Sequence, residues 1–134
     1  ICQWMNAENF RGANKYTDRG SGLHRCASSR KPINRGEPTG SNVRYVADGT
    51  ENAVTEVRLE MQMRAFRHPQ QALRRFQEYV SSLTSKALSA DLPEEASKAL
   101  MAGTTGEWPL AGRTIKLERV QDHGSSYDFY FRIH

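Results

Sequence analysis

The sequence has little cysteine or proline, and it has no long apolar run. Its 134 residues include only two cysteines and five prolines, and 37% of them are hydrophobic. No stretch approaches the ~18 consecutive apolar residues of a membrane-spanning helix. An Asn-x-Ser/Thr sequon is absent, and so are the glycine-rich loops that bind phosphates at the start of a helix. These absences exclude a helical membrane span within this sequence and the common nucleotide-binding motifs.

Signatures of catalysis and of metal binding are also missing. There is no Gly-x-Ser-x-Gly elbow, no His-Glu-x-x-His motif and no EF-hand loop. The four histidines are scattered, and no two have the i, i+4 spacing of a helical metal pair. The adjacent Glu94 and Glu95 suit a helix start and would not face each other on a helix. We predict no catalytic residue, metal ligand or cofactor. An enzyme without a recognisable motif stays an alternative, because catalytic groups converge in space.

Charge is unevenly distributed along the chain. The net charge is +4, and residues 1–42 carry seven basic and three acidic side chains, so residues 43–134 are neutral. The basic third is rich in Gly, Ser, Asn and Arg and has little hydrophobic periodicity. It is either a surface for an anionic partner or a solvated segment that its charges keep soluble.

Both cysteines, Cys2 and Cys26, lie in this basic third. A disulfide between them would close a loop of about 25 residues and stabilise the fold by roughly 3 kcal/mol. Two unpaired buried thiols are an alternative. A metal site with His24 is another, but no fourth ligand is near in sequence. The disulfide is the preferred interpretation.

A disulfide indicates an oxidising compartment. The chain begins with Ile1 rather than methionine, which is typical of a mature or excised product. We therefore expect part of an exported or membrane-anchored bacterial protein, with the periplasm as the compartment. A membrane anchor upstream of Ile1 would fit this expectation.

Hydrophobic periodicity predicts the regular elements. In chain order, we expect a helix at 1–10, strands at 23–27, 43–47 and 56–64, helices at 69–87 and 93–102, and strands at 114–120 and 127–133. This is the order α-β-β-β-α-α-β-β, typical of an α+β domain with a mostly antiparallel sheet and two helices packed on one face. We predict a single domain over residues 1–134, in which residues 1–42 are an irregular basic part tied by the disulfide and residues 43–134 are the regular core.

The apolar side of each element predicts the core. The expected core residues are Trp4, Tyr45, Val57, Leu59, Met61, Leu73, Phe76, Val80, Leu83, Leu100, Ile115, Leu117, Phe129, Phe131 and Ile133.

The basic loop and the outward sheet face supply the candidate binding residues. These are Arg30, Lys31, Arg35, Arg58, Arg64, Tyr130 and Arg132. The preferred function is a non-catalytic interaction domain for a protein or cell-envelope partner. Nucleic-acid binding through the same surfaces is the alternative, but acidic residues interleave with the basic ones on the sheet, which is simply explained by cross-strand ion pairs. The sequence predicts no oligomeric state.

Overall fold

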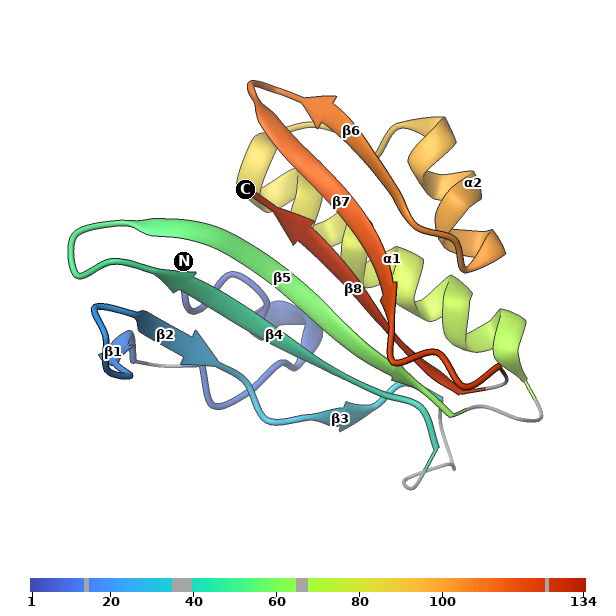
Figure 1. Ribbon diagram of the computed structural model, residues 1–134, viewed down its shortest axis with the longest axis horizontal. Helices are drawn as coiled ribbons and strands as arrows, with labels where there is room; N and C mark the ends of the chain where they lie inside the picture. Colours follow the sequence, from blue (N-terminus) through green and yellow to red (C-terminus); the bar gives the residue numbers. More distant parts are fainter. Residues whose placement is uncertain (14, 35–39, 65–67, 125) are drawn as a thin grey trace.

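The computed structural model describes residues 1–13, 15–34, 40–64, 68–124 and 126–134. Within these residues, eight strands form one antiparallel sheet in the order β1-β2-β4-β5-β8-β7-β6, and β3 pairs with β4 on the same edge as β2 (Figure 1). The strands are Thr17–Asp18 (β1), His24–Ala27 (β2), Lys31–Pro32 (β3), Asn42–Gly49 (β4), Val54–Met63 (β5), Gly106–Leu110 (β6), Arg113–Val120 (β7) and Tyr127–Ile133 (β8). Because β5 pairs with β8, the two hairpins that flank the helices meet in the middle of the sheet.

Two helices, α1 (Pro69–Leu88) and α2 (Glu94–Ala102), cover one face of this sheet (Figure 1). Helix α1 begins with Pro69, whose fixed φ suits the first helical position. Helix α2 ends at Gly103, which has a φ of 67° and so accepts the left-handed conformation of a helix end. None of the described helices has both the length and the apolar character needed to cross a membrane. The α+β class and the antiparallel sheet are confirmed.

The predicted order of elements is wrong in detail. The expected N-terminal α-helix is only a 3-10 turn, η1 (Asn6–Glu8), which stops because Asn9 takes a left-handed φ of 69°. Strands β1, β3 and β6 were not predicted. The first two have two residues each, and β6 contains Gly106 and Pro109, which are tolerated because β6 is an edge strand.

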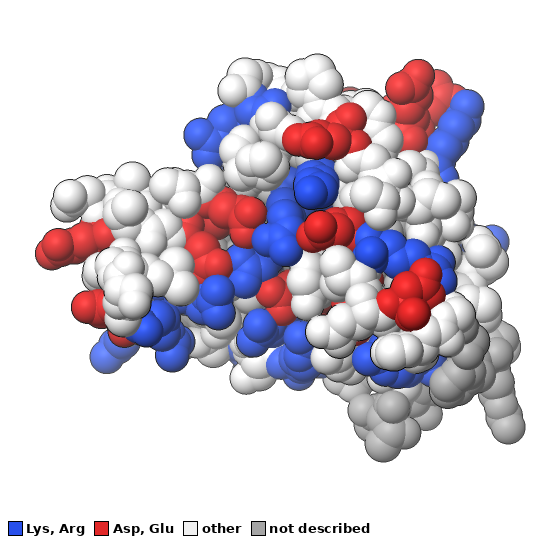
Figure 2. Space-filling model, in the orientation of Figure 1, with Lys and Arg blue, Asp and Glu red and all other residues white. Residues whose placement is uncertain are grey.

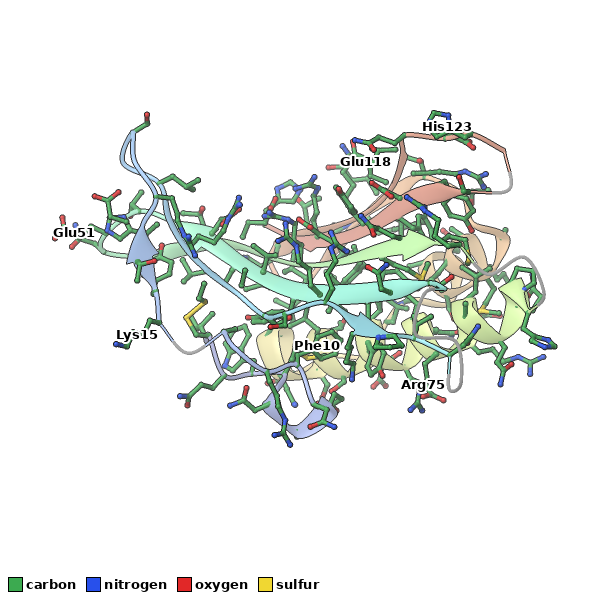
Figure 3. All side chains as sticks on the ribbon, turned by 90° about the horizontal axis from the view of Figure 1, so that it is seen from below. Phe10, Lys15, Glu51, Arg75, Glu118 and His123 are labelled. Carbon is green, nitrogen blue, oxygen red and sulfur yellow. A yellow bond between two sulfur atoms is a disulfide. The ribbon has the colours of Figure 1, made fainter. Side chains whose placement is uncertain are left out.

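The core lies between the helices and the sheet. All of the predicted core residues are buried except Trp4, which is partly buried. The prediction missed part of the core contributed by the N-terminal segment, where Met5 and Phe10 are fully buried. The ring of Phe10 meets Tyr79 of α1 edge-on, with centroids 4.9 Å apart, so the N-terminal segment extends the helical layer (Figure 3).

A disulfide and a set of polar contacts to α1 both help to hold the N-terminal segment in place. Cys2 and Cys26 form the predicted disulfide, with Cα atoms 5.9 Å apart, and it links the segment to β2. The second tie is to α1, where Ser82 Oγ donates to Glu8 at 2.7 Å and Lys86 Nζ donates to Glu8 at 2.9 Å and to the carbonyl of Trp4 at 2.6 Å. Burial opposes ionisation of Glu8, but Ser82 and Lys86 lower its pKa below the usual value.

Candidate functional site

The sheet face that points away from the helices, here called the open face, carries interleaved charges. Figure 2 shows this face, with basic and acidic side chains alternating across its middle. Each basic side chain of the set makes an ion pair. The basic members are Arg25, Arg30, Arg44, Arg58, Arg64, Lys116 and Arg132, and the acidic members are Asp48, Glu56, Glu60, Glu118 and Asp128.

Arg58 is the centre of this network. Its guanidinium donates to three carboxylates, with Nη1 2.5 Å from Asp48 and 2.9 Å from Glu56, and Nε 2.6 Å from Glu60. The strand alternation predicts Arg58 and Glu60 in water, and this is wrong, because their residues are only 6% and 4% exposed. They lie on the central strand β5, where long side chains from both neighbouring strands meet over them.

The strand register explains why the network runs diagonally. Asp48 faces Glu56 across β4 and β5, and Arg58 faces Arg132 across β5 and β8. Like charges directly opposite each other are destabilising. Arg58 bridges the two acids, and Glu56 in turn accepts from Arg132 at 3.0 Å. The two acids therefore lie between two arginines, and each like-charged pair is offset by the opposite charges beside it.

These contacts set the charge of the buried groups. Burial would raise the pKa of Glu60, but hydrogen bonds from Arg44 and Arg58 lower it below the usual 4.5. Burial likewise opposes ionisation of Asp48, and Arg25 and Arg58 lower its pKa below 3.8. Burial disfavours the charged form of Arg58, yet its pKa rises because of Asp48 and Glu60. All three groups are therefore charged at neutral pH. The open-face set has seven basic and five acidic side chains, so most of its charge is balanced locally and each cation lies beside a carboxylate.

The remaining candidate binding residues of the open face also contact other side chains of that face. Arg64 Nη2 is 3.3 Å from Asp128. The guanidinium of Arg132 lies 5.3 Å from the ring centre of Tyr130, so the aromatic ring among the candidate residues already contacts a cation of the same face. At the β6 edge of the sheet, strand addition would find one N–H donor fewer, because Pro109 has none.

The second candidate lies on the helix side of the sheet, between the N-terminal segment, β3 and α1. A hollow of about 540 Å³ is lined there by residues that include Asn9, Arg11, Arg30, Lys31 and Arg75, with Tyr79. Two neighbouring hollows, of about 340 and 440 Å³, also include Arg75 in their linings, and the first of them adds Arg74. We call the combined surface the basic groove. Its basic lining residues outnumber its acidic ones, and it also has polar and aromatic members. The basic residues are Arg11, Arg30, Lys31, Arg74 and Arg75, the acidic ones are Glu8 and Glu78, and the others include Asn9, Gln71 and Tyr79. Figure 3 shows Arg75 on the opposite side of the sheet from Glu118 of the open face.

Lys31 is the anchored cation of the basic groove. Its ammonium lies 4.4 Å from the ring centre of Phe10 and 4.6 Å from that of Tyr79, and it donates to the carbonyl of Glu8. Neither ring nor carbonyl carries a full negative charge. The Glu8 carboxylate is near enough for Lys31 to help lower its pKa, but the two form no direct ion pair, and Glu8 pairs with Lys86 instead.

The other groove cations are weakly paired. Arg74 has no hydrogen bond or ion pair with the described residues, and Arg11 donates to the Asn9 side chain at 3.0 Å. Arg75 meets Glu78 at 3.2 Å, but their side chains are 48% and 64% exposed, so the pair contributes at most about 1 kcal/mol. The basic groove therefore keeps a net positive charge at neutral pH.

The predicted site residues divide between these two surfaces. Arg58, Arg64, Tyr130 and Arg132 belong to the open face, and Lys31 belongs to the groove. Arg30 connects them, because it lines the groove while its guanidinium donates to Asn42 at 2.9 Å and lies 3.5 Å from Glu60. Arg35 lies outside the described residues.

Sequence reasoning missed Arg11, Arg74, Arg75 and Tyr79. In the sequence, Arg74 and Arg75 lie opposite the apolar stripe of the helix, which by itself indicates only a solvent-facing position, and nothing local indicates that the N-terminal segment packs beside them. The signal that could have found them is the exposed Arg-Arg pair on a helix whose other face is apolar.

No group of three or more potential metal ligands occurs in the described part of the chain. Comparison of the chain with protein-family models, curated proteins and solved structures gives no match.

Proposed function

We propose that this chain is a non-catalytic binding domain of an exported protein, and that it binds an anionic partner through the basic groove. The partner is a protein or a polymer of the cell envelope, and the compartment is the bacterial periplasm. The observation that carries this proposal is the contrast in pairing. Every open-face cation lies in an ion pair, whereas among the described residues Arg11, Lys31 and Arg74 have none and Arg75 has only an exposed one, and all four line the hollows.

Export is supported by the disulfide between Cys2 and Cys26. Such bonds persist in oxidising compartments and are rare in a reducing cytosol. Mass spectrometry after alkylation, with and without reductant, tests this part of the proposal. We expect no alkylation of the native protein without reductant, and two modified thiols would remove the argument for export.

A heparin column tests the groove itself, because retention on a polyanion depends on accessible positive charge. The groove variant is Arg74→Glu/Arg75→Glu. The matched control is Lys15→Glu/Arg19→Glu, which makes the same charge change at two exposed basic residues outside the groove (Figure 3 shows Lys15 far from Arg75). We expect the groove variant to elute at clearly lower salt than the control. Equal shifts would mean that only net charge matters, and the groove would no longer be the site.

A further inference from the structure

We propose that the basic groove binds an extended acidic segment of a partner polypeptide, with carboxylates on alternate residues. This inference rests on the proposed function and names the class of partner for the same groove.

The shape of the groove indicates an extended occupant. Its three hollows meet at Arg75, which lines each of them, and together they follow α1 from Gln71 to Tyr79. The eight helical steps from Gln71 to Tyr79, at about 1.5 Å each, span about 12 Å. An extended peptide of about four residues has this length, and its alternate side chains point to the same side.

The charges along the groove match carboxylates at separate points. Arg74 and Arg75 lie on the α1 wall, Lys31 lies on the β3 wall and Arg11 lies on the N-terminal segment. A single small anion would meet one or two of these groups, whereas a chain with several carboxylates meets cations on both walls.

Uncharged groups in the groove suit a peptide backbone. Gln71 and Asn9 line its different hollows, and each carboxamide can both donate and accept hydrogen bonds. A peptide unit presents the same combination, one N–H donor and one C=O acceptor.

Other anionic partners fit less well. Sugar rings and nucleobases stack on open aromatic faces, but Tyr79 is only 6% exposed and cations lie 4.6 and 5.7 Å from its ring centre, from Lys31 and Arg75. A lipid surface would also take up apolar side chains. The large apolar side chains exposed in the described residues, Ile1 and Leu23, do not line the groove.

Glu78 gives the proposal a gain-of-binding test. Its carboxylate already occupies Arg75 at 3.2 Å and would repel an acidic ligand. Glu78→Gln should therefore tighten binding of an acidic peptide by about two- to fivefold. The matched control is Glu94→Gln, because Glu94 also pairs with a basic residue of its own helix, Lys98 at 3.5 Å, but lies on α2 outside the groove.

The experiment is fluorescence anisotropy at low and moderate salt with three labelled probes. These are a peptide of about eight residues in which glutamate alternates with alanine, an oligogalacturonate, and a short single-stranded DNA of similar charge. Each probe is titrated with the wild type, with the two glutamate-to-glutamine variants, and with the Arg74→Glu/Arg75→Glu and Lys15→Glu/Arg19→Glu variants.

We expect the peptide to bind tightest, to weaken about tenfold or more in the groove variant, and to change by less than about threefold in the basic control. Tighter binding of the oligogalacturonate, with the same dependence on Arg74 and Arg75, would overturn this inference and leave the proposed function standing. Tighter binding of the DNA with that dependence would overturn both, in favour of nucleic-acid binding. If no probe depends on these arginines, both the inference and the proposed function are wrong. A Glu78→Gln variant that binds the peptide no better than Glu94→Gln would also contradict the inference.

Discussion

The open face and the basic groove use the same kind of residue for opposite purposes. On the open face, Arg58 is buried and donates to three carboxylates at 2.5 to 2.9 Å. In the groove, the Arg75 side chain is 48% exposed and pairs with a single exposed acid. The first arrangement stabilises the sheet, and the second leaves charge available to a partner. In this fold, the role of an arginine depends on which carboxylates its neighbours bring to it.

The largest effect expected is on the open face. Arg58→Met would leave Asp48 and Glu60 without their buried partner, which typically costs about 3 to 5 kcal/mol. The control Arg132→Met removes a cation from the neighbouring strand whose side chain is 24% exposed, and should cost about 1 kcal/mol or less. Urea unfolding measures both changes in the free energy of unfolding. Equal losses would mean that Arg58 is no more structural than its neighbour.

Removing the disulfide is the next largest change. Cys2→Ala/Cys26→Ala should lower the free energy of unfolding by about 3 kcal/mol, since the bond restricts the unfolded chain over a loop of about 25 residues. The same variant should also weaken retention on heparin, because the segment that carries Arg11 would be held by its noncovalent ties alone, among them those to α1, Lys31 and Tyr45. Retention identical to the wild type would show that those ties suffice to form the groove.

Acid should lower the free energy of unfolding through the open-face network, but by less than Arg58→Met does. The pKa values of Asp48 and Glu60 are lowered in the folded state, so their contribution is complete above their ordinary values of 3.8 and 4.5 and is lost as the pH falls through the lower folded values. Thermal unfolding from pH 7 to pH 3 should show a falling Tm, and the fall should be shallower in Arg58→Met. If the Tm of both proteins fell equally with pH, the acid sensitivity would come from groups outside the Arg58 network.

The smallest effect concerns the anchored cation of the groove. Lys31→Met keeps a long side chain between Phe10 and Tyr79 but removes the cation-π contacts, and should cost about 0.5 to 1 kcal/mol. Urea unfolding measures this loss. A cost above that of the disulfide removal would make Lys31 mainly a structural residue and would weaken its place in the groove.

Much of the fold could be predicted because its signals are local. The period-2 alternation of β5 and the apolar stripe of α1 both depend on neighbours in sequence, and both are confirmed by the burial of Leu59, Met61, Phe76 and Leu83. Strand β6 was not predicted because its signal is not local. A proline such as Pro109 indicates that a segment is not a strand, unless the strand is known to lie at the edge of a sheet.

The candidate site depended on contacts that no local pattern contains. The burial of Arg58 follows from the register of β4 and β8 against β5, and the groove follows from the N-terminal segment packing on α1. Residue type alone therefore predicted Arg58 and Arg132 as binding residues, although the structure pairs them internally, and assigned no role to Arg74 and Arg75.

The central claim is that the basic groove, and not the open face, is the anion-binding surface. Its most direct test is an NMR titration of the isotopically labelled protein with the alternating glutamate peptide, followed through backbone amide and arginine side-chain signals. We predict shifts at Arg11, Lys31, Arg74 and Arg75 and little change at Arg58 and Arg132. Shifts concentrated on the open face, with the groove signals unchanged, would contradict the account.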